Sequence, residues 1–442
     1  KKMDNKGTRF ASVRAAILDG FVHNYREYLD YLLSLNVIET DNHFIKGEKC
    51  RGYCFKSAYR GQELKRIEIT DHTLCKSIRK ATETWEKERK KALKEYAYLT
   101  KWWDEPGLEI DIKGSTRWIE EYKEERYYDI LHDEDLIDKE EEINKLVDTC
   151  EDFKRQVHSI HIRDYNYRFS GAGHRFYNPI TNLKKELRAF LSFKGQPLME
   201  LDKKNSQPYF SLALLNPSFW HKPGKEINGL YFKEIVDKGI FQRMTGGRGK
   251  IKIGTSLHAV IMLLENEETQ ARQGFGGFQK YKDCVTSDFY QHIADIFQPL
   301  YPDRFNTRDK VKKEVMRILY MDPKRDKAPF YEPAITFENH FPFVYWLFSI
   351  IKEIEHNTLA LLLQRIESYL FIDVICKQIH ASYPHIPLFT IHDCILTTKG
   401  NEHTAKAVIE EELQRWIGYP ATLHCKQVTK EYEPAGYEIA FA

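Results

Sequence analysis

The chain has 442 residues, which exceeds one ordinary domain of roughly 100–200 residues and predicts two or three domains. Charged residues make up 30%, and the longest strongly apolar run, 343–351, falls short of the ~20 residues that span a bilayer, which excludes an integral membrane protein. Lys and Arg number 67 against 65 Asp and Glu, so any polyanion site must come from local clusters of charge.

The eight cysteines are irregularly spaced and too sparse for a disulfide scaffold, so we expect a reducing, cytoplasmic setting. The first six residues lack the apolar core of a secretory signal. Cys50 and Cys54, with His43 and Cys75 nearby, could hold zinc. Their spacing lacks the paired C-x2-C pattern, so we do not favour that interpretation.

The N-terminal part of the chain is predicted to be mainly helical. Residues 10–37 carry apolar side chains at three-to-four spacing, and residues 37–44 predict a strand, a turn and a strand, closed by Tyr53 and Phe55. Helices followed by a small hairpin resemble a winged-helix unit, which binds either nucleic acid or protein. Residues 72–165 are helical and strongly charged, as is typical of a solvated arm, and the segment 102–107 interrupts them.

The pattern changes near residue 166, where strand-like runs begin to alternate with long helices. This alternation predicts an α+β domain over the rest of the chain. Two glycine-rich segments lie here, at 245–250 and 274–277. The first lacks the G-x4-G-K-[ST] spacing of a phosphate-binding loop, so we interpret it as a flexible basic loop.

Two aspartates stand at the ends of apolar, strand-like runs. Residues 196–201 lead into Asp202, and a helical stretch follows from Ser206 to Leu215. Residues 387–397 predict a β-hairpin with His392 and Asp393 at its tip. These positions suit ligands of a hard cation, although a helix cap or a core ion pair explains either aspartate alone.

A third segment, 308–320, is predicted to form a helix with an unusual stripe along one side. Its members stand four residues apart: Arg308, Lys312, Met316 and Tyr320. Two cations followed by an apolar and an aromatic group suit a ligand with phosphates and a flat ring. Together with two aspartates that hold two divalent ions ~4 Å apart, this helix would suit nucleotide transfer to a 3′-hydroxyl.

In chain order, these segments resemble motifs of the right-hand polymerases, namely DNA polymerase family A and the bacteriophage-type single-subunit RNA polymerases. Residues 202–207 resemble motif A, the 308–320 stripe matches R-x3-K-x3-[FYM]-x3-Y of motif B, and His392-Asp393 resembles motif C. Gly173-His174-Arg175, followed by 178–183 and 187–190, resembles the upstream arginine motif. Gln364 resembles a glutamine before motif C. The resemblance covers about residues 166–400.

The resemblance implies an α+β right-hand polymerase with palm, fingers and thumb, in a bacterial, phage or mobile-element setting. The expected parts are a winged-helix-like N-terminal region (1–75), a helical thumb-like arm (76–165), a palm (166–215 and 346–442) and fingers (216–345). We expect no proofreading exonuclease, because the first 165 residues offer no D-x-E pair on a strand. The promoter-reading domain of the phage enzymes is also expected to be absent.

The resemblance also implies roles for single residues. Asp202 and Asp393 would hold two Mg²⁺ or Mn²⁺ ions, with the Lys203 carbonyl as a further ligand. Arg308 and Lys312 would bind a nucleoside triphosphate, and Lys312 could protonate the leaving pyrophosphate. Met316, Tyr320 and Gln207 would contact the nucleotide. The residues that would hold the primer and template are Arg175, Arg188, Gln364 and His392.

Two residues depart from the family pattern: Met321 where Gly is usual, and Cys394 where the DNA enzymes have Glu and the phage RNA enzymes Ser. The residue five after the motif A aspartate is Glu in the DNA enzymes and Gly in the RNA enzymes. Here it is Gln207, which could exclude a 2′-hydroxyl by its bulk or donate a hydrogen bond to one. Met316 resembles the RNA enzymes, whereas Gln207 and Gln364 resemble the DNA enzymes. We favour DNA synthesis, with RNA synthesis, by a single-subunit polymerase or in a primase-like way, as the alternative.

A second alternative is a nucleic-acid-binding replication protein without catalysis, which the winged-helix-like start and the two departures favour. A metal-dependent nuclease would leave the 308–320 stripe without a purpose, so we favour it least. Basic residues around the motifs would make nucleic-acid binding weaken as salt rises. These residues are Lys203, Lys204, Arg243, Arg248, Lys250, Lys252, Lys310, Lys312, Lys313 and Arg317.

Overall fold

The computed structural model of the chain describes residues 10–12, 18–19, 22, 24–42, 51–59, 68–165, 167–169, 174–220, 262, 264, 266, 278–321, 331–354 and 356–428. Backbone contacts divide the chain into two compact units, Lys1–Ala97 with Asp111–Ser159, and Tyr98–Ile110 with Ile160–Ala442. Helices and sheets occur together, which confirms the predicted α+β class. The finer division into palm, fingers and thumb stays a prediction. No helix within the described residues is both long and apolar enough to cross a membrane.

The first unit begins with a small antiparallel sheet in which β1 (Ala11–Ser12) and β2 (Ile38–Thr40) both pair with β3 (Gly52–Phe55). The helix α2 (Tyr25–Ser34) precedes β2, and a 3-10 turn, Ser57–Tyr59, follows β3. One expectation was wrong here, because residues 11–12 form a strand and not part of a helix. β2 pairs with 52–55, and residues 43–44 of the expected second strand lie outside the described residues. Asp41 Oδ1 accepts from the amide of Gly52 at 2.8 Å and extends the contact with β3 beyond β2.

The zinc interpretation finds little support among its described members. His43 and Cys50 lie outside the described residues. The thiol of Cys54 instead donates to Glu39 Oε1 at 3.2 Å, and that of Cys75 donates to the carbonyl of Ile69 at 3.1 Å. Each described cysteine of the set therefore has a hydrogen-bond partner of another kind.

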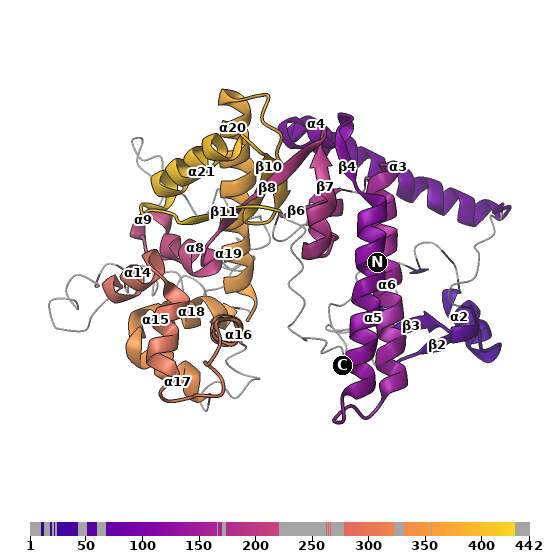
Figure 1. Ribbon diagram of the computed structural model, residues 1–442, viewed down its shortest axis with the longest axis horizontal. Helices are drawn as coiled ribbons and strands as arrows, with labels where there is room; N and C mark the ends of the chain where they lie inside the picture. The colour runs from indigo at the N-terminus through magenta and orange to yellow at the C-terminus, as the bar shows by residue number, and fades with distance from the viewer. Residues whose placement is uncertain are drawn as a thin grey trace, which may run out of the picture. The chain divides into compact units, whose positions relative to one another are not determined.

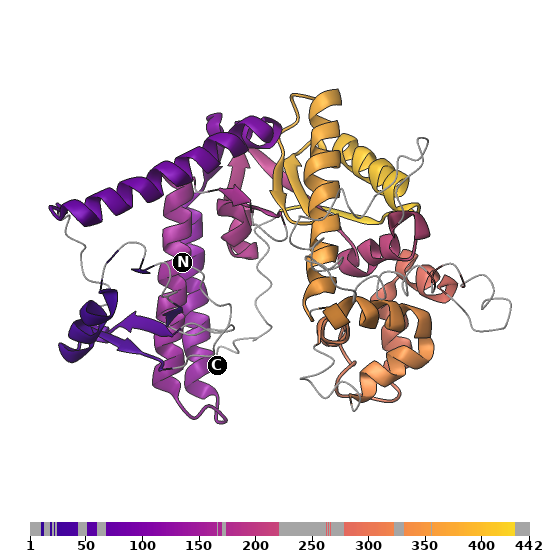
Figure 2. The same ribbon diagram turned by 180° about the vertical axis from the view of Figure 1, so that it is seen from behind.

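Three long helices complete the first unit: α3 (His72–Glu95), α5 (Ile112–His132) and α6 (Lys139–His161), whose last residues belong to the second unit. α5 and α6 lie side by side (Figures 1 and 2). Trp118 of α5 packs against Phe153 of α6, with ring centroids 6.5 Å apart, and Lys154 pairs with Glu120 at 2.8 Å. The charged arm predicted from the sequence is therefore a helical hairpin with an aromatic seam.

The second unit is built around an antiparallel sheet in the order β4-β7-β8-β10-β9, with β11 also paired to β8. The strands are β4 (Leu108–Ile110), β7 (Leu191–Phe193), β8 (Gln196–Lys203), β9 (Phe389–Ile391), β10 (Cys394–Thr398) and β11 (Leu423–Gln427). β8 pairs with three neighbours and is the centre of the sheet. The predicted strand into Asp202 and the predicted 387–397 hairpin are both confirmed.

The two faces of this sheet are covered differently. α21 (Glu402–Ile417) packs against β8, β10 and β11, and its Glu402 and Lys406 lie near Cys425, which pairs with Leu201. On the other face, α4 (Ala97–Asp104) packs Trp103 against Phe389 with ring centroids 5.3 Å apart. The segment at 102–107, expected to interrupt the arm, thus begins within a core helix of the second unit.

The second unit also contains many helices. They are α8 (Ser206–Leu214), α9 (Pro217–Trp220), α14 (Gln279–Thr286), α15 (Phe289–Phe297), α16 (Arg308–Tyr320), α17 (Glu332–His340), α18 (Pro342–Ile354), α19 (Thr358–Ser368) and α20 (Lys377–Ser382). Of these, α14, α15, α16, α17 and α18 form a group beyond α8 (Figure 1). α16 confirms the predicted helix at 308–320. A π-helical segment, Tyr369–Cys376, joins α19 to α20 into one long rod, and the Tyr98 hydroxyl donates to its Ile372 carbonyl at 3.0 Å. Both glycine-rich segments, and Arg243, Arg248, Lys250 and Lys252, lie outside the described residues.

A short hairpin, β5 (Arg168–Phe169) and β6 (Phe176–Tyr177), leads to α7 (Pro179–Asn182) and the 3-10 helix Lys185–Phe190. Asn178 ties this segment to the sheet. Its side chain caps α7 by accepting from the amides of Ile180 and Thr181, and its Nδ2 donates to the Thr390 carbonyl on β9 at 2.8 Å. One buried amide therefore fixes the segment that follows Arg175 against the hairpin that carries Asp393.

We expect Asn178→Ala to lower the free energy of unfolding by about 2–3 kcal/mol, because it removes a helix cap and a buried hydrogen-bond donor. Urea unfolding measures this change. Asn182→Ala, at an exposed position of the same short helix, is the matched control and should stay within about 0.5 kcal/mol. Equal losses in the two variants would contradict this role of Asn178.

Candidate active site

Two aspartates that are far apart in the sequence lie side by side at one end of the central strands. Pairing of β8 with β10 sets Cys394 directly opposite Asp202, and the amide of Lys203 donates to the carbonyl of Asp393 at 3.3 Å. The chain reverses at His392, which has a φ of 57°, a left-handed conformation uncommon for a residue other than Gly. The tight turn therefore sets Asp393 next to the end of β8.

The electrostatics of this pair suit a bound cation. Burial, together with the charges of Asp393 and Glu200, raises the pKa of Asp202 to about 6. Burial also raises the pKa of Asp393, although a hydrogen bond from the Ser206 hydroxyl opposes this shift. Repulsion between neighbouring carboxylates is relieved by a divalent ion, and carboxylate oxygens are the donors that Mg²⁺ and Mn²⁺ prefer. The residues present fit the expected metal ions.

Lys203 adjoins this pair but buries its own side chain. Its Nζ donates to the Lys204 carbonyl at 2.5 Å and lies 4.0 Å from the centre of the Tyr209 ring. Burial lowers the pKa of Lys203 to about 7, against the opposing charges of Asp393 and Asp202. The side chain thus serves packing between β8 and α8, and the role expected for its carbonyl as a metal ligand stays a prediction.

The helix α16 carries the predicted stripe, of which Lys312 lies near the aspartates. Arg308 and Lys312 are exposed, whereas Met316 and Tyr320 are half-buried. The opposite side of the helix is buried through Val311, Val315, Ile318 and Leu319. The charge of Lys312 lowers the pKa of both Asp202 and Asp393, so this cation faces the pair.

Arg308 has a partner that the sequence did not predict. Its guanidinium donates two hydrogen bonds to Asp288, at 2.9 and 3.0 Å, and lies 5.6 Å from the centre of the Tyr290 ring. Both members of the ion pair are about half exposed, so the pair contributes little to stability and its charge can be exchanged for another anion. The spacing of α16 gave no signal for Asp288, which lies on a separate segment.

A chain of hydrogen bonds joins four segments near the inner end of α16. The Tyr320 hydroxyl donates to Gln207 Oε1 at 2.7 Å, and Gln207 Nε2 donates to Glu367 Oε2 at 2.6 Å. Arg175 donates to Glu367 Oε1 from Nη2 at 2.7 Å and from Nε at 3.1 Å. Gln207 and Tyr320, both expected to contact the nucleotide, are thus in direct contact, and Glu367 is a residue that the sequence analysis missed.

A signal for Glu367 was available in the sequence. It lies three residues after the predicted Gln364 on α19, and the neighbouring Leu363, Ile366 and Leu370 are fully buried. A lone carboxyl in such an apolar helix requires partners, and that requirement could have marked it. Gln364 itself lies half-buried on α19.

The remaining predicted residues gather at the tip of the β9–β10 hairpin. The His392 ring meets the edge of Tyr177, with centroids 5.5 Å apart. Burial, followed by the charges of Arg175 and Arg188, lowers the pKa of His392 to about 4, so the imidazole is neutral at pH 7. Arg188 also donates to the Leu183 carbonyl at 3.3 Å. The structure thus brings Arg175, Arg188 and His392 together, while their contact with a primer or template stays a prediction.

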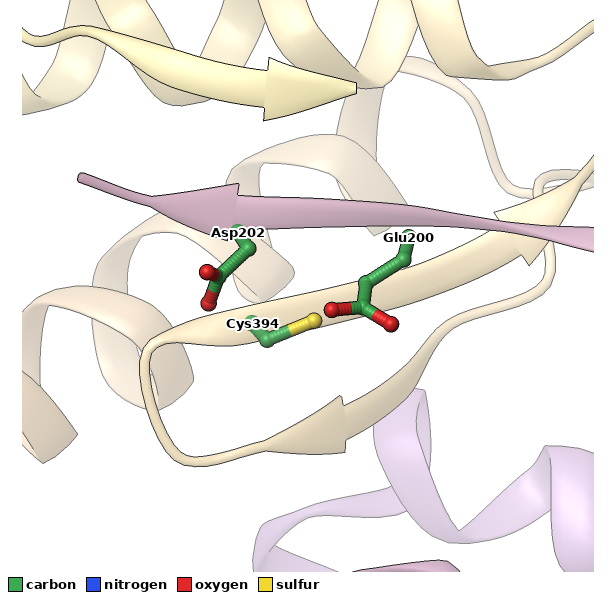
Figure 3. Close-up of side chains that lie close together, drawn as sticks. All are labelled: Glu200, Asp202 and Cys394. Atoms are coloured by element: carbon green, nitrogen blue, oxygen red, sulfur yellow. The ribbon is translucent and has the colours of Figure 1, made fainter. Parts of the chain in front are cut away.

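A second acidic group lies beside Asp202. Figure 3 shows Glu200, Asp202 and Cys394 pointing to the same side of their strands, with ligand atoms that lie within 4.8 Å of one another. Glu200 also approaches Lys426 of β11 at 3.8 Å. Strand alternation places residue 200 on the face of residue 202, and this signal was missed.

No family model matches this chain, and no curated protein matches it. Among solved structures, the chain is similar to the POL domain of Pol1 from M. smegmatis in a complex with DNA primer-template and dNTP, at 10% sequence identity. The match covers 74% of this chain and 68% of that chain, with a TM-score of 0.40. A TM-score of this size does not establish a shared fold or function.

The raised pKa of Glu367 predicts that the stability of the fold depends on pH. Burial first, and then the charge of Asp393, raises the pKa of Glu367 to about 8 from a usual value near 4.5. Between these values the folded chain holds a proton that the unfolded chain has released, so the contribution of Glu367 to stability falls as pH rises from ~4.5 to ~8. Glu367→Gln, which resembles the protonated form, should therefore gain stability relative to the unmutated chain as pH rises. Urea unfolding at pH 5.5, 7 and 8.5 tests this, and a difference that is constant across pH would contradict it.

Proposed function

We propose that this chain is a template-directed nucleotidyltransferase, and specifically a minimal DNA polymerase of the family A type without a proofreading exonuclease. The observation that carries the proposal is the meeting of Asp202 and Asp393 at the end of β8, with the charge of Lys312 on α16 acting on both. Paired carboxylates opposite a cationic helix suit a substrate that brings both metal ions and phosphates.

Asp202 and Asp393 would hold two Mg²⁺ or Mn²⁺ ions, with the Lys203 carbonyl as a further ligand. When bound, such ions supply activation of a primer 3′-hydroxyl and stabilisation of the leaving pyrophosphate. The Ser206 hydroxyl, hydrogen-bonded to Asp393, orients that carboxylate. The residues of the pair thus act mainly as fixed anionic ligands on a rigid sheet.

The cations of α16 would bind the triphosphate. Lys312 is exposed and its charge lowers the pKa of both aspartates, so it would contact phosphate oxygens and give a proton to the leaving pyrophosphate. Arg308 would exchange Asp288 for phosphate, since a guanidinium binds phosphate through two parallel hydrogen bonds. Met316 and Tyr320 would then lie against the sugar and base.

The hydrogen bonds of Gln207 favour selection of deoxynucleotides. Its amide oxygen accepts from Tyr320 and its amide nitrogen donates to Glu367, so the side chain is held in place and its bulk excludes a 2′-hydroxyl. Arg175, Arg188, Gln364 and His392 would contact the primer and template. The parts proposed for the fold are the palm at 166–215 and 346–442, fingers at 216–345, the thumb at 76–165 and a winged-helix-like region at 1–75.

We expect Asp202→Asn and Asp393→Asn each to reduce primer extension by 10³-fold or more in the presence of Mg²⁺ or Mn²⁺, roughly the loss expected when a metal ligand of the reaction is removed. Extension of a labelled primer on a DNA template is the measurement. Glu412→Gln, a buried carboxylate of α21 that binds Trp416, is the matched control and should retain extension. Undiminished extension in either aspartate variant would refute the metal assignment. Absence of extension by the unmutated chain would favour a non-catalytic binding protein.

Gln207→Gly should relax discrimination against ribonucleotides by about tenfold or more, because it removes the group expected to exclude the 2′-hydroxyl. The measurement is kcat/KM for a deoxynucleotide divided by that for the matching ribonucleotide. If the unmutated chain uses the two sugars equally, no gate exists at this position. If it prefers ribonucleotides, the product is RNA and the alternative of an RNA polymerase is correct.

A further inference from the structure

Glu367 is a buried carboxyl group with no place in the chemistry proposed above. The residue is 1% exposed, and it lies behind Gln207 rather than among the metal ligands. Three N–H donors converge on it: two from Arg175 on Oε1, and one from Gln207 on Oε2. A buried carboxyl group with this many donors is held firmly in position, and it can therefore fix the group that donates to it.

The direction of these hydrogen bonds determines the orientation of the Gln207 amide when Glu367 is ionised. Both carboxylate oxygens then accept, so the NH₂ end of the amide points to α19 and the oxygen points to Tyr320. The Tyr320 hydroxyl has one proton, which it uses to donate a hydrogen bond to Gln207. A tyrosine in this state has no proton to offer to a second hydroxyl group.

We propose that Glu367 is the positioning residue for sugar selection: it holds the Gln207 amide in one orientation, so that Gln207 stays in place and Tyr320 cannot donate to a 2′-oxygen. This inference rests on the proposed polymerase function. A ribonucleotide would have to displace an amide anchored at both ends, and its 2′-oxygen would find no donor from Tyr320. Glu367 acts through Gln207 and contacts no substrate.

The variant Glu367→Gln tests this directly, because it should invert the Gln207 amide. Arg175 requires an acceptor, so it would bind the oxygen of the new side chain and turn the new NH₂ group toward Gln207. Two NH₂ groups cannot face each other, so Gln207 would present its oxygen to residue 367 and its NH₂ group to Tyr320. The Tyr320 proton would then be free to bind a 2′-oxygen. Measured at pH 9, where Glu367 of the unmutated chain is ionised, discrimination between deoxy- and ribonucleotides, as a ratio of kcat/KM values, should fall about tenfold.

The exchange variant Gln207→Glu/Glu367→Gln should restore discrimination to within about threefold of the unmutated chain. In this variant the new NH₂ group at 367 donates to the new carboxylate at 207, which also accepts from Tyr320. Every hydrogen bond toward Tyr320 is thus kept with its direction. Because this variant keeps the hydrogen bonds between residues 207, 320 and 367, it still tests the positioning role if Glu367→Gln alone does not fold. An exchange variant that folds but discriminates as poorly as Gln207→Ala would overturn the proposal.

A third comparison separates positioning from general damage to the fold. In a Gln207→Ala background, Glu367→Gln should change the sugar ratio by less than about twofold, since the side chain it acts through is gone. Equal effects of Glu367→Gln in the two backgrounds would overturn the proposal. Glu412→Gln removes a buried carboxyl that accepts from Arg415 and Trp416, and it should leave the ratio unchanged. A similar fall in this control would show a nonspecific effect and count against Glu367.

The outcomes distinguish this inference from the proposed function. If the unmutated chain extends primers and discriminates between sugars, but Glu367→Gln discriminates equally well, then the positioning role is wrong and the polymerase function stands. If the unmutated chain does not extend primers on any template, both fail. If it extends primers without discriminating between sugars, the function stands and this inference fails.

Discussion

The antiparallel pairing of β8 with β10 is the interaction on which the candidate site depends. The register sets Cys394 opposite Asp202, and the tight turn at His392 then carries Asp393 to the end of β8. A slip of one residue would turn Asp202 to the opposite face of the sheet, among the buried side chains of Leu201 and Ile395. Burial of Leu201 and Ile395 on the α21 face makes such a slip costly, so the apolar core of the sheet is what holds two repelling carboxylates together.

The parts of the site that the sequence predicted are those with a local pattern. A strand ending in an aspartate, a hairpin with a polar tip and a helix with residues at spacing four are each contained in fewer than 15 consecutive residues, and all three form as expected. The hydrogen bonds of Glu367 join residues 175, 207, 320 and 367, so no window of sequence contains them. The packing of Trp103 could not be predicted for a similar reason, because its partner Phe389 lies on a strand far along the chain.

The carboxyl group of Glu367 on α19 is fixed by hydrogen bonds from Arg175 and Gln207. It is still coupled to the aspartates, because the charge of Asp393 raises its pKa. Asp202, Asp393 and Glu200 already repel one another, so a protonated Glu367 avoids adding a further negative charge near them. Gln207 presents a neutral amide on the side of Tyr320 and leaves the carboxyl buried behind it. Arg175 contributes in both places: it donates hydrogen bonds to Glu367, and its charge lowers the pKa of Asp393 and of His392.

The π-helical segment between α19 and α20 fixes the angular relation between the two ends of the rod. A residue more or less in an α-helix rotates everything beyond it by about 100°. Residues 369–376 therefore determine the direction in which Glu367 points relative to α20. α20 is held near α4 because His380 stacks on Tyr98. Tyr98 also donates a hydrogen bond to the Ile372 carbonyl within the π-helical segment. Tyr98 therefore helps to fix the rotation of α19 relative to α20. Loss of a single residue there would leave every helix intact and still point the carboxyl away from its partners.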